Sequence, residues 1–333
     1  MRIAALTPRS IVNSIYRTVV PMSALAQRGH EVHVEERDVG HDLARLRQYD
    51  AVHVLRLCDE PTQVLTRRLK EAGVALLWDN DDNLTAPEKG NPNYKLHLRE
   101  GRRIQAAMRA MMVRADVVTT TNAMLAELYR GASGADVRII ENYLPASFAP
   151  PQERIPHDGV WIGWVAAAEH RRDVERLRLT EVVTDLLERH PQLTVVTVGV
   201  SLGVRSDRYM RVPEQHYGDL PKVLAELDVG IAPLADIPFN HGRSNVKLKE
   251  YSAMGLPWLA SAMGPYAGMG EKQGGRLVPD DRWREEIEAL IADARARRKL
   301  GRNAAKWARG ETIESHVDAW ERAFEDAIRA ARA

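Results

Sequence analysis

The stretch 239–261, FNHGRSNVKLKEYSAMGLPWLAS, predicts a short helix set between a loop and an apolar strand. Ser244 or Asn245 can cap this helix, because both side chains accept hydrogen bonds from the free N–H groups of a first turn. Gly255 suits the left-handed residue that follows a helix, and Pro257 stops the helix there. A helix followed by a buried strand is typical of the repeating unit of α/β proteins.

The charge at the start of this helix conflicts with the helix dipole. Its first turns carry Arg243, Lys247 and Lys249, whereas a helix N-terminus bears about half a positive charge and favours acidic side chains. A bound anion resolves the conflict, and a phosphate group is a common resident of helix N-termini. Glu250 lies one turn after Lys247, in position to accept hydrogen bonds from two ribose hydroxyls. The alternative is a solvated helix start; with the loop 242–245 before it, we favour the anion site.

Outward from this stretch, apolar strand-like runs alternate with helical patterns along the chain. Strands are expected at 2–6, 31–34, 51–55, 74–78, 117–120, 138–140, 160–165, 193–198, 229–232 and 257–260. Helices are expected at 21–27, 63–72, 99–115, 123–129, 173–190, 221–227, 245–254, 282–294 and 314–331. This alternation predicts parallel sheets that are covered on both faces.

A break near the middle of the chain divides the pattern into two similar halves. The segment 145–158 holds four prolines and no periodicity, which is typical of a linker. We therefore expect an N-terminal domain over 1–150 and a C-terminal domain over 151–310, both α/β and doubly wound, facing each other across a cleft. The segment 311–333 is expected to form a helix that packs back on the N-terminal domain.

Composition narrows the class of protein. The chain has 333 residues, which suits two domains, and a formal net charge of +1, which disfavours nucleic acid as a partner. A lone cysteine, Cys58, excludes an intramolecular disulfide, and no apolar run reaches the roughly 20 residues of a membrane-spanning helix. We expect no secretory signal and a cytoplasmic location. The helix 99–114 is basic on one side, so peripheral membrane contact is an alternative to a solvated face. The oligomeric state stays open.

Several short motifs lie around the deciding helix and at the ends of expected strands. They are Ser244-x-x-Lys247-x-x-Glu250-Tyr251 with Gly255-x-Pro257, IGW at 162–164 with HRRD at 170–173, DVGIAPL at 228–234, and GRLV at 275–278 with Trp283. Together they resemble the donor-binding region of family 4-type glycosyltransferases of the GT-B fold, densely over 160–310 and diffusely before it. The resemblance implies two Rossmann-like doubly wound domains and a nucleotide-sugar-dependent transferase that retains the anomeric configuration.

The resemblance also implies a donor site. Glu250 is expected to bind the ribose, and Lys247 with Arg171 or Arg172 to lie by the diphosphate. Lys247, Arg172 and Asp81 are expected to act in catalysis, the two cations by neutralising charge on the leaving diphosphate. Further donor contacts are expected from Asn240, His241, Gly242, Arg243, Ser244, Asn245, His170 and Gly199. No metal and no cofactor is expected beside the nucleotide-sugar co-substrate.

The acceptor site is expected in the N-terminal domain. Its candidate residues are Arg9, Tyr16 and Arg17 in the loop 7–17, and Asp79 and Asp82 in the acidic run 79–82. Neighbouring carboxylates repel one another unless they face a ligand or a cation, which favours a place in the cleft. Loop and helix-cap roles are the alternative for this run, and whether it binds a metal stays open.

Departures from the family pattern keep other functions open. Gly242 stands where the family often has a glutamate that contacts the donor sugar, and 166–168 is a run of alanines where glycines are common. These departures suit a catalytically weakened, glycosyltransferase-like partner or binding protein. A GT-B epimerase of nucleotide sugars is a third hypothesis. His53, inside an apolar strand, is expected to be a hydrogen-bonded core histidine.

Overall fold

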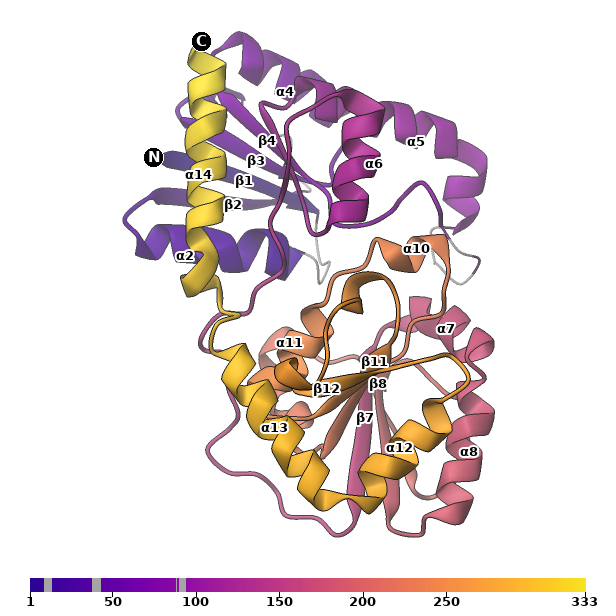
Figure 1. Cartoon of the computed structure of the whole chain (residues 1–333). Coiled ribbons are helices and arrows are strands. Elements are labelled where there is room, and N and C mark those ends of the chain that lie inside the picture. Colours follow the sequence, from indigo (N-terminus) through magenta and orange to yellow (C-terminus); the bar gives the residue numbers. More distant parts are fainter. Residues whose placement is uncertain (9–13, 38–42, 88, 90–93) are drawn as a thin grey trace.

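The structure is a computed structural model that describes residues 1–8, 14–37, 43–87, 89 and 94–333. It contains two parallel six-stranded sheets, one in each half of the chain (Figure 1). The N-terminal strands are β1 (Arg2–Pro8), β2 (Glu31–Arg37), β3 (Ala51–Leu55), β4 (Ala75–Asp79), β5 (Val117–Thr120) and β6 (Val137–Ile139). The C-terminal strands are β7 (Val160–Ala166), β8 (Leu193–Gly199), β9 (Tyr209–Val212), β10 (Val229–Ala232), β11 (Trp258–Ser261) and β12 (Gly275–Val278).

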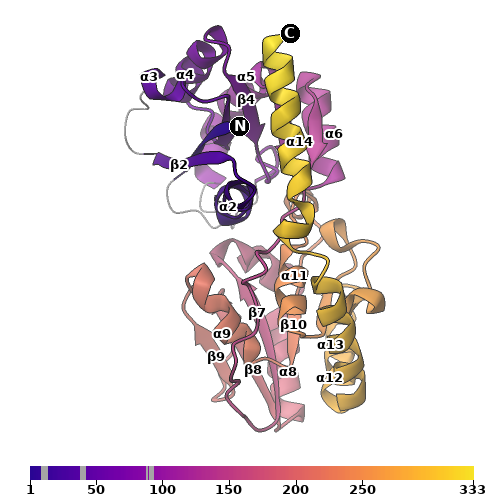
Figure 2. The same cartoon turned by 90° about the vertical axis from the view of Figure 1, so that its left-hand side faces the viewer.

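The N-terminal sheet has the order β2-β1-β3-β4-β5-β6 and is covered on both faces. Helices α4 (Glu60–Glu71), α5 (Tyr94–Arg114) and α6 (Ala123–Ser133) pack on one face, where Trp78 lies fully buried. A π-helical turn, η1 (Ile15–Val19), leads into α2 (Val20–Gln27) on the other face. The last helix, α14 (Ile313–Arg332), shares this second face and buries Trp320 and Phe324 against it (Figures 1 and 2). The end of the chain therefore completes the core of its first domain.

The C-terminal sheet has the order β12-β11-β10-β7-β8-β9. Helices α7 (Arg171–Arg176), α8 (Leu179–Arg189) and α12 (Trp283–Ala292) pack on one face, and α9 (Leu220–Ala225) and α11 (Val246–Ala253) on the other. Further helices of this half include α10 (Pro238–His241) before α11, α13 (Ala294–Ala308) after α12, and the short η3 (Tyr217–Asp219) before α9. Strand β9 was not predicted, because it is a short edge strand whose side chains are all half-buried or exposed and show no alternation.

The chain crosses between the two domains twice, once near Leu144 and once near Thr312, and the two segments run side by side. We call these two segments the crossing strands. Leu144 pairs with Thr312 in a parallel bridge, and the amide of Ile313 donates to the carbonyl of Leu144 at 2.8 Å. The first crossing thus comes earlier than the proline-rich segment in which we expected it. Phe148, near the start of that segment, is already buried in the C-terminal core, and Arg154 donates to the carbonyl of Leu227 at 3.0 Å. The prolines border the hinge but do not form it.

One buried side chain differs from its predicted state. His53 lies in the middle of β3 and is fully buried, as a core residue should be, but neither ring nitrogen has a hydrogen-bond partner in the described part of the chain. Its ring packs edge-on against Trp320 of α14. Burial lowers the pKa of His53 to about 4, so the ring is neutral in the folded protein.

In the described part of the chain, no helix is both long enough and apolar enough to cross a bilayer.

Candidate functional site

A cavity of about 340 Å³ lies between the two domains, at the carboxyl ends of their central strands. We call it the interdomain cavity. The N-terminal domain contributes residues from η1 and from the end of β4, and the C-terminal domain contributes the loop after β7 and the start of α11. Ligands of doubly wound folds bind in this position, outside the carboxyl ends of the strands. The predicted site residues that line it are Tyr16, Asp81, Asp82, His170, Arg243, Ser244 and Lys247.

The start of helix α11 faces the interdomain cavity without a side-chain cap. Asn245 is its N-cap residue, but the side chain makes no capping hydrogen bond and donates instead to Glu141 at 3.1 Å. The Ser244 hydroxyl accepts a hydrogen bond from Asn142 at 3.2 Å. The predicted cap is therefore not formed. Because first-turn N–H groups need partners, this helix start is suited to an anion.

Lys247, in the first turn of α11 on its cavity side, is paired with Glu250. The ammonium lies 3.0 Å from Oε2 of Glu250, which is fully buried. The other carboxylate oxygen accepts a hydrogen bond from the hydroxyl of Tyr16, which comes from the N-terminal domain. Burial raises the pKa of Tyr16 well above its usual value, and the charge of Glu250 adds to the shift, so the hydroxyl keeps its proton. In this structure, Tyr16 of the N-terminal domain donates to the Glu250 carboxylate, which we expected to bind a ribose.

Lys249, which we counted with the basic helix start, lies on the opposite side of α11. Its ammonium is fully buried, 2.9 Å from Glu141 and 2.8 Å from Glu311. It also lies over the ring of Tyr143, 3.9 Å from the centroid. Glu141 and Glu311 sit on the two crossing strands, so Lys249 ties the C-terminal domain to the hinge. It does not contribute to the interdomain cavity.

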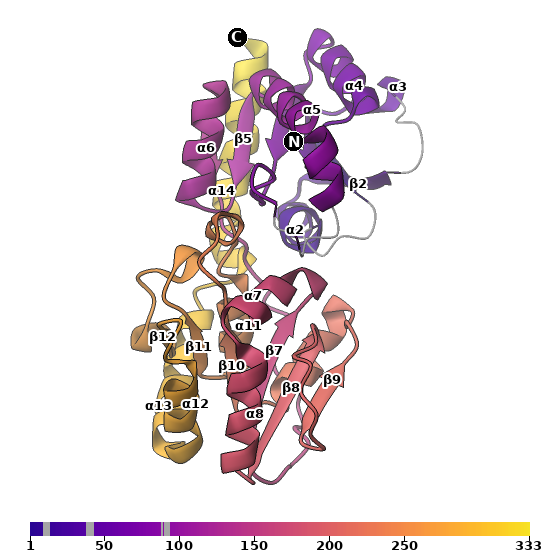
Figure 3. The same ribbon diagram turned by 90° about the vertical axis from the view of Figure 1, so that its right-hand side faces the viewer.

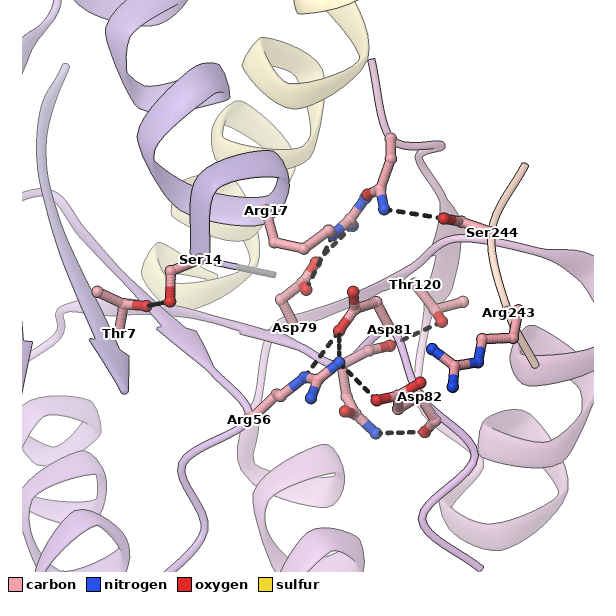
Figure 4. A network of polar contacts seen from close by, with 12 residues as sticks. Thr7, Ser14, Arg17, Arg56, Asp79, Asp81, Asp82, Thr120, Arg243 and Ser244 are labelled. Carbon is pink, nitrogen blue, oxygen red and sulfur yellow. Dashed lines mark hydrogen bonds and ion pairs between the residues drawn. The ribbon is translucent and has the colours of Figure 1, made fainter. Parts of the chain in front are cut away.

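Arg243 is the second cation of the interdomain cavity. Its Nη1 lies 3.4 Å from Glu169, and its guanidinium lies over the ring of Phe239 at 4.9 Å from the centroid. Figure 4 shows the guanidinium facing Asp82 across the domain boundary. Its buried Nε has no hydrogen-bond partner among the described residues. Burial alone would raise the pKa of Glu169, but the charge of Arg243 lowers it below the usual value.

The acidic run after β4 is neutralised by arginines. Arg56 donates to Asp81 through Nε at 2.7 Å and to Asp82 through Nη2 at 2.9 Å (Figure 4). Burial raises the pKa of Asp82, although Arg56 opposes the shift. Arg56 has a φ of +57°, in the left-handed region that residues other than glycine rarely adopt. This backbone turn at the end of β3 is a strained feature of the kind that clusters at functional sites.

Asp79 and Arg17, which we predicted to bind the acceptor, do not line the interdomain cavity. Both are fully buried, and they form a two-pronged ion pair with distances of 3.1 and 2.6 Å. Asp79 also accepts a hydrogen bond from Thr119 at 2.5 Å, and Arg17 donates to Asn142 at 3.1 Å. The π-helical turn η1 explains the difference, because it directs Arg17 into the core while Tyr16 beside it reaches the cavity. The pair anchors η1 to the end of β4.

The basic residues after β7 also differ from expectation. Arg171 and Arg172 bond to Glu175 at 3.1 and 2.9 Å on the outer side of α7 and do not line the interdomain cavity. The cavity therefore takes its second cation from Arg243. His170 does line it and makes a 2.7 Å contact with Asp173. Burial lowers the pKa of His170, and the charge of Arg243 lowers it further, which favours the neutral ring.

Three further donor candidates have structural partners instead. Asn240 is buried and donates to Asp173 at 2.7 Å. His241 pairs with Asp236 at 2.7 Å on the surface. Gly199 ends β8 with a φ of +85° at a place where a Cβ atom would approach the carbonyl of Ala166 to 2.5 Å. These contacts lie within the C-terminal domain and explain the positions of the three residues without a donor.

Gly242 lies at the contact between the domains. A Cβ atom there would approach Asn83 to 2.9 Å and Leu125 of α6 to 3.2 Å. Asn122, the residue that caps α6, donates to the carbonyl of Arg243 at 3.0 Å, and Figures 1 and 3 show α10 lying against the end of α6. A side chain at Gly242 would press on Asn83 and Leu125, so this contact leaves little room for a glutamate there.

Sequence reasoning did not find several residues of the interdomain cavity. Glu169, Asn142 and Tyr217 line it, and Arg56 orients its acidic residues. None of them belongs to a motif, and each reaches the site through tertiary contacts. Arg9, a predicted acceptor residue, lies outside the described residues.

Comparison with solved structures gives the fold. The chain is similar to HepE from Anabaena in complex with UDP and glucose, with a TM-score of 0.69 and 13% identity, covering 97% of this chain and 98% of that one. It is similar to an alpha-glucosyltransferase in complex with UDP and a DNA that contains an HMU base, with a TM-score of 0.65 and 11% identity over 99% of both chains. No family model matches the sequence, and no curated protein matches it. The chain has the GT-B fold. Membership of glycosyltransferase family 4 remains a prediction.

Proposed function

We propose that this protein is a glycosyltransferase that moves a sugar from a nucleoside-diphosphate sugar to an acceptor hydroxyl in the interdomain cavity. The observation that carries the proposal is the start of α11, which faces the cavity without a side-chain cap and with two cations beside it, Lys247 and Arg243. The structures similar in fold include proteins in complex with UDP, which supports a uridine nucleotide as the first candidate donor.

Each part of the donor has a matching group. The diphosphate fits the N–H groups of the first turn of α11, with Lys247 and Arg243 neutralising its charge. The ribose hydroxyls fit Glu250 once the Tyr16 hydroxyl has left it. The sugar would then lie toward Asp82 and His170, whose polar atoms can accept hydrogen bonds from sugar hydroxyls. This orientation points the reacting carbon at the N-terminal domain.

The proposed reaction replaces one C–O bond with another. The bond between the anomeric carbon and the diphosphate oxygen breaks, and a bond from the same carbon to the acceptor oxygen forms. Lys247 and Arg243 stabilise the negative charge that grows on the leaving diphosphate. We propose retention of anomeric configuration, with the acceptor proton passing to the leaving diphosphate oxygen on the same face of the sugar. Proton NMR of the fresh product gives its anomeric configuration. An inverted product would contradict this step and would favour Asp82, whose pKa burial raises, as the base.

The direct test is a thermal-shift screen with nucleoside diphosphates. A ligand at 100 times its dissociation constant adds about 2.7 kcal/mol of stability, which is a readily measured rise in Tm. Release of nucleoside diphosphate from the matching nucleotide sugar should then follow. If no nucleoside diphosphate shifts the Tm and no nucleotide sugar turns over, the proposal is wrong.

The bond between Tyr16 and Glu250 favours a second candidate function. If Tyr16 stays on Glu250, the chain is a GT-B binding protein or a partner of another enzyme that no longer transfers sugar. Such a protein would give no turnover with any donor. A nucleotide-sugar epimerase, the third hypothesis, would change the donor sugar without an acceptor, so analysis of the sugar product separates it from a transferase.

A further inference from the structure

A second cavity adjoins the interdomain cavity on the side of α2. It has a volume of about 520 Å³ and lies between α2, the first crossing strand and the start of α14. We call it the α2 groove. Ile15 and Tyr217 line both cavities, so the two spaces meet at these side chains. Figure 2 shows α2 and the lower end of α14 facing the boundary between the domains.

The walls of the α2 groove are mainly apolar. Val19, Val20 and Ala24 line it from the first domain, and Pro145 and Ile313 line it from the crossing strands. Val19 is 45% exposed, so part of its apolar side chain faces the open side of the groove. The groove therefore offers apolar surface to a ligand.

The α2 groove carries little charge. None of the described residues that line it is a lysine, an arginine or a histidine. Its one acidic residue, Glu314, is engaged, because both carboxylate oxygens accept from the amide of Ala146 at 3.1 Å. A phosphorylated or otherwise anionic group would find no counter-charge there. An uncharged apolar group fits the chemistry of these walls.

The junction of the two cavities holds an unsatisfied hydrogen-bonding group. The hydroxyl of Tyr217 is buried and has no hydrogen-bond partner in the described part of the chain. Its ring is fixed between Phe148, at a centroid distance of 5.2 Å, and Tyr16, at 5.4 Å and edge-on. A buried hydroxyl without a partner is costly, so a ligand that supplies a hydrogen bond at this point would be favoured.

We propose that the α2 groove binds the uncharged apolar part of the acceptor, whose hydroxyl group passes Tyr217 into the interdomain cavity. This inference rests on the proposed function, and it names the class of acceptor: a small alcohol or glycoside with an apolar tail. The volume of the groove suits a small-molecule group rather than a polymer or a bilayer.

The experiment measures binding directly and so does not depend on turnover. Methyl, hexyl and octyl glucosides, each below its micellar concentration, are titrated calorimetrically into the whole protein. Octyl glucoside should bind more tightly than methyl glucoside by a factor of about ten or more, because each buried methylene adds to the affinity. Equal affinities along the series would overturn the proposal. Sedimentation of the wild-type protein, but not of Ser23→Arg, with neutral phosphatidylcholine vesicles would also overturn it, by assigning the groove to a membrane surface.

Matched variants on one helix locate the binding. Ser23 and Ala26 are both exposed on α2, but only Ser23 lines the α2 groove. Ser23→Arg should abolish the dependence on chain length, and Ala26→Arg should leave it unchanged. Ser147→Trp fills the groove from the opposite wall and should act like Ser23→Arg. Loss of the dependence in all three variants, or in none, contradicts the assignment.

A parallel measurement separates this inference from the proposed function. The rise in Tm with UDP reports on the donor site and should be the same in wild type and in the Ser23→Arg and Ala26→Arg variants. If UDP binds but chain length has no effect, the groove assignment alone is wrong. If chain length matters but no nucleotide sugar binds or turns over, the groove remains a ligand site and the transferase proposal is wrong.

Discussion

The two sides of helix α11 place the same residue type in opposite roles. On the cavity side, Lys247 is 24% exposed and has one carboxylate partner among the described residues, Glu250. On the hinge side, Lys249 is fully buried between two carboxylates and an aromatic ring. Two residues along an α-helix correspond to a rotation of about 200°, so these neighbours in sequence point in opposite directions.

The difference shows that enclosure, more than charge, separates a binding cation from a structural one. Lys247 faces a cavity large enough for a ligand, so its charge is available to an incoming anion. The Lys249 ammonium is already neutralised by Glu141 and Glu311 and is covered by the ring of Tyr143. Its charge is therefore not available to a ligand anion. The two sides of α11 should therefore respond differently to the same kind of substitution.

The largest expected effect is on stability and concerns the hinge side. Lys249→Met should lower the free energy of unfolding by about 3 kcal/mol, because it leaves Glu141 and Glu311 without their shared cation. Urea denaturation measures this change. Lys222→Met, at an exposed lysine of α9, is the control and should be nearly neutral. A Lys249→Met variant as stable as wild type would remove the structural role.

Lys247→Ala should act on turnover instead. We expect kcat to fall about 100-fold, since charge on the leaving diphosphate grows toward the transition state. Stability should fall by less than in Lys249→Met, because the Tyr16 hydroxyl still donates to Glu250 and removal of a cation from the helix start offsets part of the loss. Steady-state assay of nucleoside diphosphate release, with denaturation of the same sample, tests both. Full activity together with higher stability would show that the start of α11 has a structural role and does not bind the donor.

Glu250→Ala should weaken nucleotide binding about tenfold or more, because a charged hydrogen bond contributes roughly 1.5–3 kcal/mol. The matched control is Glu141→Ala, which removes a carboxylate that contacts Lys249 on the hinge side of the same helix. Calorimetric titration with UDP should separate the two variants. Equal losses of affinity would show that the effect arises from general destabilisation and not from the donor site.

Tyr16→Phe should strengthen nucleotide binding about fivefold, because the variant lacks the hydroxyl that occupies Glu250. Tyr49→Phe, remote from the cavity, should leave the affinity unchanged. The same titration measures both. Weaker binding by Tyr16→Phe would instead mean that the hydroxyl contacts the nucleotide.

The smallest expected effect is on the pH dependence of stability at the hinge. Burial alone would raise the pKa of Glu141, but the charge of Lys249 and its hydrogen bond lower it below 4.5. A depressed folded-state pKa gives stability that is present above pH 4.5 and lost as the pH falls through the folded-state pKa. The stability difference between wild type and Lys249→Met should therefore shrink in acid. A difference that stays constant from pH 7 to pH 3 would contradict the ion pair.

Local patterns predicted the fold well. The expected strands of the first half all form, the Gly255 exit has the predicted left-handed backbone with a φ of +70°, and the chain has the predicted GT-B fold. These features depend on residues close together in sequence, whose periodicity and turn chemistry are legible there. Two features were harder to predict: the edge strand β9 is too short and exposed to leave a pattern, and the hinge lies before the prolines that suggested it.

The amino-acid sequence by itself determined the alternation of strands and helices, the basic start of α11, and the acidic run at the end of β4. Only the tertiary structure decided which of these charges face the cavity. Tyr16 meets Glu250 across 234 positions of the chain, and Arg17 meets Asp79 across 62. A side chain's partner at such separations depends on how two packed sheets and their crossing strands are placed. Burial then fixes whether a charge is neutralised inside the protein or left available to a ligand.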